Sequence, residues 1–443
     1  MGIKDEEELS LVPCAIAPTF DSQGRMMPIQ TPAVSQRTTC LAILALALAS
    51  PALGQEVVVN NTVELREELQ RAEPGTTIRL EGSSYESGLW IDGVAGTKDK
   101  PIIITGADEK NPPVFMGENQ AIHLVGCNYI TLRNIRVTGC KANGINADDG
   151  GRYEFPPAGL VFENVTIDRI GPTGNHDGLK LSGLDGFTVR DCRFDGWGGS
   201  AIDMVGCRNG LVVGCRFFGR KGYSQSSGVQ AKGGSENITI RRSFFKDAGQ
   251  RSINIGGSTG LRYFRPKLRD YEARAIIVEG NRFVGSAAPI AYVTSVDCVV
   301  RQNTIVHPEK WIVRILQEQP TEKFRPCQGS TFESNLVMFD ERVRSLINVG
   351  PNTLPMTFSF RGNAWFRSDS DRRPILPLDE IDGIYQIDPM LKDAETPAST
   401  ARSKDPRLLG IGAHAFDKQY AGAGLEKQTK EPGSSASENQ TDR

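Results

Sequence analysis

Short runs of alternating apolar and polar residues recur through the middle of the chain. One kind of run occupies 176–183, 200–206, 227–233 and 252–256, and a second kind occupies 187–194, 211–218 and 238–245. Glycine-rich turns separate the runs, and each kind returns after about 22–28 residues, a spacing typical of repeat architectures. Alternation with a period of two residues predicts strands rather than helices.

A single repeat cannot bury its own apolar face, whereas stacked repeats enclose a continuous core. The sequence therefore predicts a solenoid of stacked coils, with longer connections at 147–158, 258–273 and 316–328. Ahead of the coils, residues 62–72 predict an amphipathic helix with Thr62 as its N-cap. We expect this helix to cover the open end of the core, because terminal repeats need a cap.

The strand openings Asn-Val-Thr-Ile at 164–167 and Asn-Ile-Thr-Ile at 237–240 add a family likeness to this pattern. With the repeat, they resemble the right-handed parallel β-helix, the pectin-lyase-like superfold, over roughly residues 57 to 390. The resemblance implies an all-β, single-domain solenoid with an N-terminal helical cap. It does not decide the activity, since this superfold includes lyases, hydrolases, epimerases and non-enzymatic adhesins.

The two ends of the chain differ from the repeats. Residues 26–54 combine Arg37, an apolar run at 40–49 and small residues up to Gly54, which predicts a signal peptide. We therefore expect residues 1–25 to be an upstream extension, residues 55–392 to be the solenoid of a secreted or periplasmic protein, and residues 393–443 to be a polar, largely disordered tail. No other stretch is long and apolar enough to span a membrane.

Charge and cysteine content limit which ligands, disulfides and metals the chain is expected to have. The chain has 51 basic and 53 acidic residues, which does not favour nucleic-acid binding. Cys192 and Cys215 occupy equivalent places in neighbouring coils and could be bridged, but free thiols packed in the core are the simpler interpretation. No Cys or His spacing indicates a structural metal. We expect a monomer.

Alternation along the first kind of run assigns its polar residues to one outer face. The predicted outward row is Asn146, Lys180, Asp203, Gln230, Asn254, Tyr292, Arg314 and Asn348. Five coil steps separate Lys180 from Arg314, about 24 Å, so the row predicts a straight polar groove for an extended ligand. The alternative is a plain ladder of solvated polar residues.

The connection at 258–273 is basic and aromatic, and it includes Arg265. Long loops in compact folds are often functional. If this loop overhangs the row, it indicates an acidic polysaccharide as the partner, stacked on aromatic rings and paired with guanidinium groups. Otherwise its arginines only shield the flank of the solenoid.

Cleavage of an acidic glycan by β-elimination needs a base and a cation at the sugar carboxylate. The segments 230–237 and 249–257 are similar to the Lys coil and the following Arg coil of the chondroitinase B and alginate lyase family. The resemblance implies that Lys232 is the base, that an arginine one coil on binds the carboxylate, and that calcium assists. The sequence departs from the family because that arginine should fall near Asn254 or Gly256, whereas Arg251 lies earlier, about 17 Å from Lys232 along straight strands. No acidic pair that could hold calcium lies just before Lys232.

Two other sets of residues offer different chemistry. Tyr292 and Arg314 would form a base and carboxylate pair if they lie in one row. Residues 175–178 faintly resemble the Asn-Thr-Asp opening of β-helix polygalacturonases, which makes Asp177 and Asp203 a hydrolase pair about 11 Å apart. His176 and Asp177 could instead act as base and orienter in an epimerase or lyase. We expect a polysaccharide lyase, and the alternatives are a hydrolase or epimerase, or a glycan-binding protein without catalysis.

Overall fold

The computed structural model describes residues 55–422, except residues 87 and 118. The predicted signal peptide and the last part of the predicted tail, 423–443, lie outside the described residues. Among the described residues, no helix is long and apolar enough to cross a membrane.

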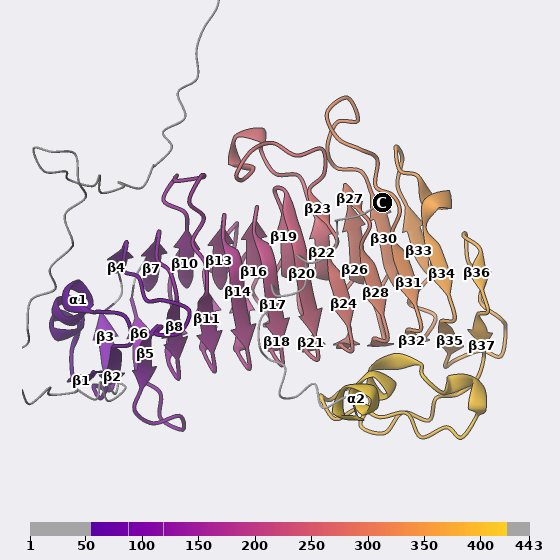
Figure 1. Cartoon of the computed structure of the whole chain (residues 1–443). Helices are drawn as coiled ribbons and strands as arrows, with labels where there is room; N and C mark the ends of the chain where they lie inside the picture. The colour runs from indigo at the N-terminus through magenta and orange to yellow at the C-terminus, as the bar shows by residue number, and fades with distance from the viewer. Residues whose placement is uncertain (1–54, 87, 118, 423–443) are drawn as a thin grey trace, which may run out of the picture. The chain divides into compact units, whose positions relative to one another are not determined.

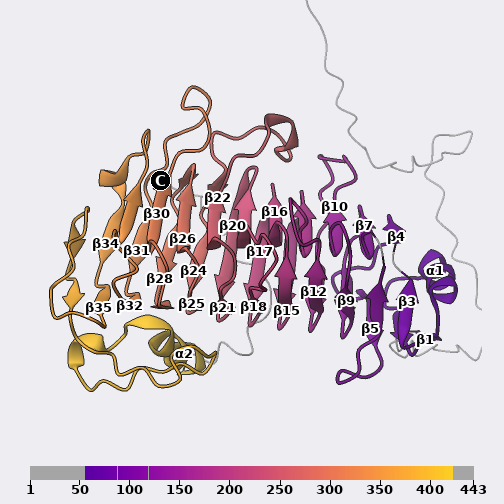
Figure 2. The same ribbon diagram turned by 180° about the vertical axis from the view of Figure 1, so that it is seen from behind.

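The chain winds through three parallel sheets, and each strand pairs with strands about one coil away in sequence (Figures 1 and 2). The ten-stranded sheet contains β4 (Leu89–Asp92), β7 (Ile122–Val125), β10 (Ile145–Asp148), β13 (Leu179–Ser182), β16 (Ser200–Val205), β19 (Ser227–Lys232), β22 (Arg251–Gly256), β26 (Ala288–Val293), β30 (Val313–Leu316) and β33 (Ile347–Val349). The twelve-stranded sheet contains β3 (Ser84–Glu86), β6 (Val114–Met116), β9 (Arg136–Thr138), β12 (Thr166–Ile170), β15 (Arg193–Trp197), β18 (Arg216–Phe218), β21 (Phe244–Lys246), β25 (Arg282–Val284), β29 (Thr304–Val306), β32 (Leu336–Phe339), β35 (Ala364–Arg367) and β37 (Ile384–Tyr385).

The third sheet has fifteen strands. It contains β1 (Glu56–Val59), β2 (Thr77–Leu80), β5 (Ile102–Gly106), β8 (Ile130–Arg133), β11 (Leu160–Glu163), β14 (Asp185–Arg190), β17 (Arg208–Val213), β20 (Ser235–Arg241), β23 (Ala273–Arg274), β24 (Ile277–Glu279), β27 (Ser295–Val296), β28 (Val299–Arg301), β31 (Thr331–Glu333), β34 (Ser359–Arg361) and β36 (Glu380–Ile381). The predicted parallel β-helix is confirmed: a full coil crosses all three sheets before the next begins.

Equivalent residues of successive coils stack inside the solenoid. Phe194, Phe217, Phe245 and Phe283 form one such column, with centroid distances of 4.9, 4.5 and 4.8 Å between successive rings. The cysteines among the described residues are all free and buried, which confirms packed thiols at Cys192 and Cys215 rather than a bridge. Apolar and aromatic stacking therefore forms the continuous core that one coil alone could not make.

Buried asparagines form a second column, between the fifteen- and twelve-stranded sheets. The backbone N–H and the Nδ2 of Asn281 both donate to Oδ1 of Asn303, at 2.9 and 3.0 Å. The same two bonds join Asn303 to Asn335 and Asn335 to Asn363. The column ends at Glu380, which accepts from Asn363 and whose pKa is raised by burial. Each amide thus satisfies backbone groups that the turns leave without partners.

One register row of the fifteen-stranded sheet alternates in charge. Its members are Arg133, Glu163, Arg190, Val213, Arg241, Glu279, Arg301, Glu333 and Arg361. Ion pairs of 2.9 Å join Arg190 to Glu163, and of 2.7 Å join Arg301 to Glu279. With one exception at Val213, each side chain in the row therefore faces opposite charge in the neighbouring coil.

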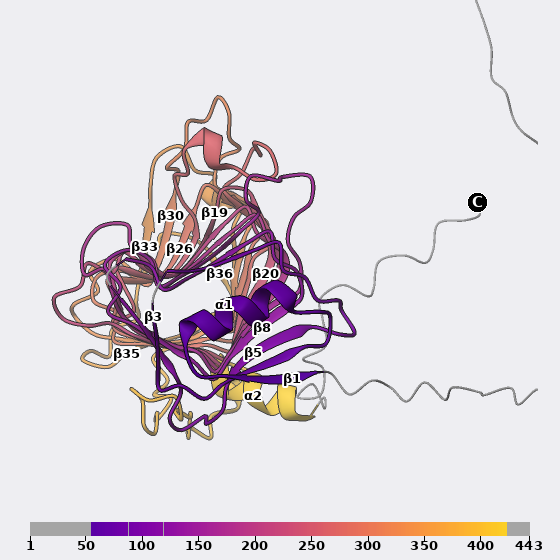
Figure 3. The ribbon, with the colours of Figure 1, turned by 90° about the vertical axis from the view of Figure 1, so that its left-hand side faces the viewer.

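Helix α1 (Thr62–Arg71) lies across the N-terminal end of the coils (Figure 3). Its Leu65 and Leu69 are buried in the core, as the amphipathic pattern predicts. The predicted N-cap was wrong by one residue: Asn61 accepts the N–H groups of Val63 and Glu64, whereas the Thr62 hydroxyl accepts the N–H of Glu86. The neighbouring strand β3 thus occupies the hydroxyl that would otherwise cap the helix.

Residues 393–422 correct the expectation of a disordered tail. This segment contains the short helix η3 (Pro406–Leu408) and helix α2 (Gly412–Gly422). Two other short helices, η1 (Leu261–Tyr263) and η2 (Pro355–Thr357), lie earlier in the chain. Ala413, Phe416 and Tyr420 of α2 are buried. Arg282 Nη2 binds Asp417 Oδ2 at 2.6 Å. The apolar content was too sparse to predict a helix, and docking on the coils supplies the burial.

The asparagine column predicts a large loss of stability when it is interrupted. Asn303→Ala removes the acceptor of two Asn281 donors and leaves buried backbone carbonyls without a donor, so the free energy of unfolding should fall by about 2–4 kcal/mol. Urea denaturation measures this change. The matched control Asn111→Ala alters an exposed asparagine and should change stability by less than about 0.5 kcal/mol. Equal losses in the two variants would contradict a structural role for the column.

Candidate functional site

The outer face of the ten-stranded sheet carries a polar row that Ala291 interrupts once. Strand register aligns Asn146, Lys180, Asp203, Gln230 and Asn254 in successive coils, as predicted. The row then continues through Ala291 to Arg314 and Asn348. Polar side chains therefore follow one line across the sheet, in the direction of coil stacking.

Tyr292 is not part of this row. It pairs with Ile255, points into the core and is fully buried, and its hydroxyl donates to the Thr331 carbonyl at 2.7 Å. Burial raises its pKa well above the usual value. The predicted pair of Tyr292 and Arg314 is therefore wrong: after the 258–273 insertion the count along β26 was off by one residue, which reverses the face of a side chain, whereas Arg314 and Asn348 lie in the row as predicted.

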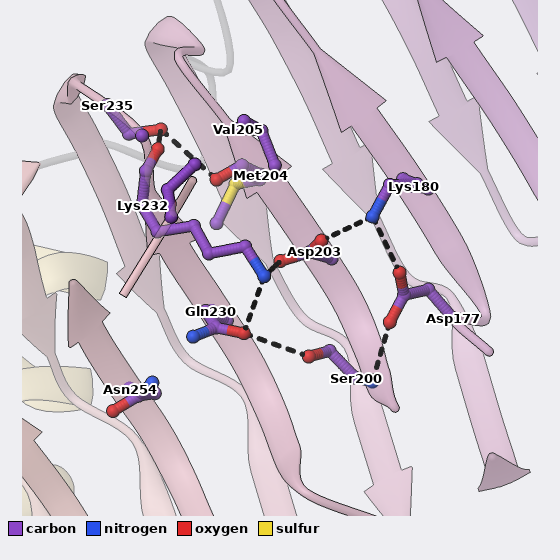
Figure 4. A network of polar contacts seen from close by, with 12 residues as sticks. Asp177, Lys180, Ser200, Asp203, Met204, Val205, Gln230, Lys232, Ser235 and Asn254 are labelled. Atoms are coloured by element: carbon purple, nitrogen blue, oxygen red, sulfur yellow. Dashed lines mark hydrogen bonds and ion pairs between the residues drawn. The ribbon is translucent and has the colours of Figure 1, made fainter. Parts of the chain in front are cut away.

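A chain of charges crosses three coils at the centre of the row (Figure 4). Lys180 Nζ lies 2.9 Å from Asp177 Oδ2 and 2.6 Å from Asp203 Oδ2. Lys232 Nζ lies 3.1 Å from Asp203 Oδ1 and 3.3 Å from Gln230 Oε1. Lys232 points outward as predicted, and Asp203 lies between the two lysines.

Burial and neighbouring charges shift the pKa values of Asp177, Asp203 and Lys180 in different directions. Both aspartate side chains are 0% exposed, whereas those of Lys180 and Lys232 are 26% and 18% exposed. Burial and the charge of Asp203 raise the pKa of Asp177. Burial also acts to raise the pKa of Asp203, but Lys232 and Lys180 outweigh it and lower that pKa. For Lys180, burial acts to lower the pKa, and the two carboxylates outweigh it and raise it. Asp203 is therefore the fixed anion of the group.

The two aspartates lie closer together than sequence spacing predicts. Since Oδ2 of each accepts from the same Nζ, at 2.9 and 2.6 Å, these oxygens are separated by no more than about 5.5 Å. That separation would suit a pair of catalytic carboxylates. Both are buried beneath the lysines, however, and both hold lysine ammonium groups, so the geometry favours a supporting role over direct attack on a ligand.

His176 does not orient against Asp177. The Asp177 Oδ1 accepts the N–H of Ser200 at 2.8 Å and its Oδ2 accepts from Lys180, so both oxygens are occupied. The His176 Nδ1 is buried and has no hydrogen-bond partner among the described residues. The predicted base and orienter pair is therefore wrong, because the aspartate turns toward Lys180 instead.

The side chain of Arg251 reaches the polar row from the start of β22. Its Nη1 donates to Asn254 Oδ1 at 3.0 Å, and its Nη2 binds Glu318 Oε1 at 2.8 Å. Backbone spacing placed this arginine too early for the lyase resemblance. The structure brings its guanidinium beside Asn254, the position where that resemblance expects an arginine.

Arg314 extends the positive charge farther along the row. Its Nε donates to Asn348 Oδ1 at 3.0 Å, and its guanidinium lies 4.4 Å from the centre of the Trp311 ring. Burial lowers its pKa, and the charge of Arg251 lowers it further. The central and C-terminal parts of the row thus carry four cations, Lys180, Lys232, Arg251 and Arg314, against the carboxylates of Asp177, Asp203 and Glu318.

The loops 258–273 and 316–328 pack together beside the ends of these strands. Phe264 in the 258–273 loop and Phe324 in the 316–328 loop are buried, with ring centroids 5.5 Å apart. The buried Glu272 accepts from the N–H groups of Gly233 and Thr259, at 2.7 and 2.6 Å. This anchor ties the 258–273 loop to the residue that follows Lys232.

Arg265 is occupied within the protein. Its Nε binds Asp149 Oδ2 at 2.8 Å, and its side chain is only 17% exposed. The loop therefore does flank the polar row, but this arginine fixes the loop to an earlier coil and is not free to bind a substrate carboxylate.

Sequence reasoning missed the N-terminal part of the row. His123 and Trp90 precede Asn146 in the same register. Asp148, two residues beyond Asn146, lies 2.6 Å from Nε2 of His123. Extending the count of alternating residues back by two coils could have found them, but those early runs lack the Gly-rich repeat of the later coils.

The described residues do not fit the calcium ion that the resemblance implies. Within 55–422, apart from the two omitted positions, no three His, Cys, Asp or Glu side chains converge as a metal site. In the central row, the oxygens of Asp177 and Asp203 face lysines. We therefore derive no chemical step that uses calcium.

Comparison with known proteins supports the fold. The family model described as a right handed beta helix region matches residues 120–305. With the strand topology, this match confirms the predicted right-handed parallel β-helix. No curated protein matches the chain.

Three solved structures illustrate the likeness. An alginate lyase from Paenibacillus sp. str. FPU-7 is 17% identical, with 75% of this chain and 98% of that chain covered and a TM-score of 0.45. Pectate lyase Pel9A is 13% identical, with 78% and 85% covered and a TM-score of 0.49. The A-module of mannuronan C-5 epimerase AlgE4 from Azotobacter vinelandii is 13% identical, with 76% and 96% covered and a TM-score of 0.43. All three TM-scores are below 0.5, so the fold rests on the strand topology and the family model, and the site rests on the residues of this chain.

The charge chain predicts unequal effects for its two aspartates. Asp203→Asn leaves two partly buried lysines short of an anion and should lower the free energy of unfolding at pH 7 by about 3–5 kcal/mol. Asp177→Asn leaves Lys180 paired with Asp203 and keeps an acceptor for Ser200, so about 1–2 kcal/mol is expected. Chemical denaturation measures both, and an equal or larger loss in Asp177→Asn would contradict the arrangement.

The pH dependence of the two losses should run in opposite directions. The lowered pKa of Asp203 contributes stability that is complete above its usual value of 3.8 and is lost as the pH falls through the lowered pKa. The Asp203→Asn deficit should therefore shrink only below about pH 4. The raised pKa of Asp177 contributes stability below 3.8 that is lost as the pH rises through the raised pKa, so the Asp177→Asn deficit should shrink with rising pH. Parallel trends in the two variants would contradict these opposite shifts.

Proposed function

We propose that this protein is a polysaccharide lyase that cleaves an acidic glycan by β-elimination in the polar row. The observation that carries the proposal is the position of Arg251: its guanidinium lies beside Asn254, one coil beyond Gln230 and Lys232. A base candidate and a carboxylate-binding cation therefore occur in adjacent coils, where consecutive parts of an extended glycan would lie.

The chemistry assigns a separate role to each cation. Arg251 exchanges the partly exposed Glu318 for the uronate carboxylate and stabilises the negative charge that develops when the neighbouring proton leaves. Lys232, as the amine, takes that proton, the C–O bond to the leaving sugar breaks as a C=C bond forms, and the leaving oxygen takes a proton from water. Asp203 and Gln230 hold the Lys232 side chain over the sheet. Arg314 binds the glycan farther along the row.

One observation favours a second function, glycan binding without catalysis. Lys232 Nζ lies 3.1 Å from the buried Asp203 carboxylate, and a lysine must release its proton before it can act as a base. A row of ammonium and guanidinium groups held in place by buried anions suits retention of an acidic polymer equally well. The two functions differ in what Lys232 contributes.

The Lys232→Ala variant separates these functions. In a lyase, this variant should lose turnover of a uronic-acid glycan by about 1,000-fold or more while its affinity changes by less than about tenfold. Turnover is followed by the absorbance of the unsaturated uronate and by reducing ends, on alginate, pectate and chondroitin, with and without calcium. Lys246→Ala, a partly exposed lysine in the twelve-stranded sheet, is the matched control.

Each outcome of this assay has a defined meaning. New absorbance that disappears in Lys232→Ala supports the lyase. Reducing ends without absorbance would transfer the chemistry to hydrolysis and reject the assigned roles. Retained glycan binding with neither product would favour the binding protein. A requirement for calcium would show that a metal site exists that the described side chains do not form.

Access to such a glycan forms part of the same proposal. We propose that the chain is exported, with the signal peptide at 26–54 removed near Gly54, and that it acts as a monomer. Mass spectrometry of the exported protein should then find a mature N-terminus at Gln55, and an unprocessed N-terminus in the exported fraction would contradict cleavage at that position.

A further inference from the structure

The polar row has an aromatic end. Asn146 is in register with His123, and His123 with Trp90. Trp90 is 58% exposed, and its ring meets the His123 ring edge-on, with centroids 4.3 Å apart. A large indole that stays exposed on a polar sheet face offers an apolar surface to a ligand.

Hydrogen-bonding groups lie directly beside this indole. His123 Nε2 is 2.6 Å from Asp148 Oδ2, and the Gly150 N–H donates to Asp148 Oδ1 at 2.9 Å. Burial acts to raise the Asp148 pKa, but these bonds outweigh it and lower that pKa. An ionised carboxylate can only accept hydrogen bonds, so the Nε2 that faces Asp148 is the donor of this contact.

Charge distinguishes this end of the row from its centre. Two arginines near it are already paired: Arg152 Nη2 with Asp92 Oδ1 at 3.0 Å, and Arg265 Nε with Asp149 Oδ2 at 2.8 Å. Asp148 is matched by a histidine rather than by a lysine or arginine. A uronate placed here would meet the charge of Asp148 at close range, whereas an uncharged ring would not.

The structure also provides space at this end. Trp90 lines a hollow of about 630 Å³ between α1 and β4, together with Arg66, Gln70 and Asp92. This volume is within the range of known small-ligand sites. Arg66 lies on the exposed side of α1, and the indole forms the boundary between the hollow and the row.

We propose that Trp90, His123 and Asp148 form a subsite for an uncharged sugar ring at the N-terminal end of the row. The C–H face of the ring packs on the indole, and hydroxyl groups at its edge bond to His123 and Asp148. This inference rests on the proposed function in that the row binds a glycan, and it adds that the glycan contains neutral as well as uronic units.

Isothermal titration of the full-length protein with neutral hexasaccharides tests the subsite. The probes are β-1,4-linked glucose, mannose and xylose hexamers, with a galacturonate hexamer for comparison. At least one neutral hexamer should bind, Trp90→Ala should weaken that binding about tenfold or more, and Trp90→Phe should weaken it less, since a smaller aromatic face remains. Phe155→Ala removes another exposed aromatic, 77% exposed and outside the row, and should leave binding unchanged.

Several outcomes would overturn the subsite. They are no binding of any neutral hexamer, equal binding by wild type and Trp90→Ala, or a Trp90 dependence seen only with the galacturonate hexamer. Thermal unfolding of Trp90→Ala, expected near that of the wild type, excludes misfolding as the cause of lost binding. Failure of the lyase proposal is separate: it is the absence of new absorbance with uronic glycans, whereas the subsite is measured by heat of binding to uncharged sugars.

Discussion

The pairing of each coil with the next is the constraint on which the structure depends. Backbone hydrogen bonds hold neighbouring parallel strands about 4.8 Å apart, and alternation then decides which side chains enter the core and which stay outside. In the ten-stranded sheet, this register brings Lys180, Asp203 and Gln230 side by side. It also makes the buried Asp203 tolerable, because an anion without partners would be too costly to bury.

Much of the fold is predictable because its information is local. Leu179, Leu181, Ile202 and Met204 alternate with polar residues, and a period of two residues that returns every coil implies stacked strands. The helix at 62–71 was equally visible, but its N-cap depended on whether Asn61 or Thr62 had a competing partner. Helix α2 could not be predicted from its own residues, since its few apolar side chains are buried only by docking on distant coils.

For the candidate site too, the features set by local sequence could be predicted, and those set by contacts between distant residues could not. The residues of the row that precede the 258–273 insertion were placed on the correct face, from Asn146 to Asn254. After the 258–273 insertion Tyr292 was exchanged for Ala291, whereas Arg314 and Asn348 farther along were placed correctly. Side-chain reach lies outside any count along a strand: Arg251 extends to Asn254, and Asp177 turns toward Lys180, because hydrogen bonds and charge select those rotamers.

The alternating charge row of the fifteen-stranded sheet bears on how such a chain could have lengthened during evolution. Duplication of a single coil, such as that of Arg190, would place two arginines directly opposite each other, and like charges in adjacent strands destabilise a sheet. Duplication of two consecutive coils would preserve the order of charges. The row therefore favours growth of this solenoid by pairs of coils, and the neutral Val213 marks the one step at which an odd insertion would have met no repulsion.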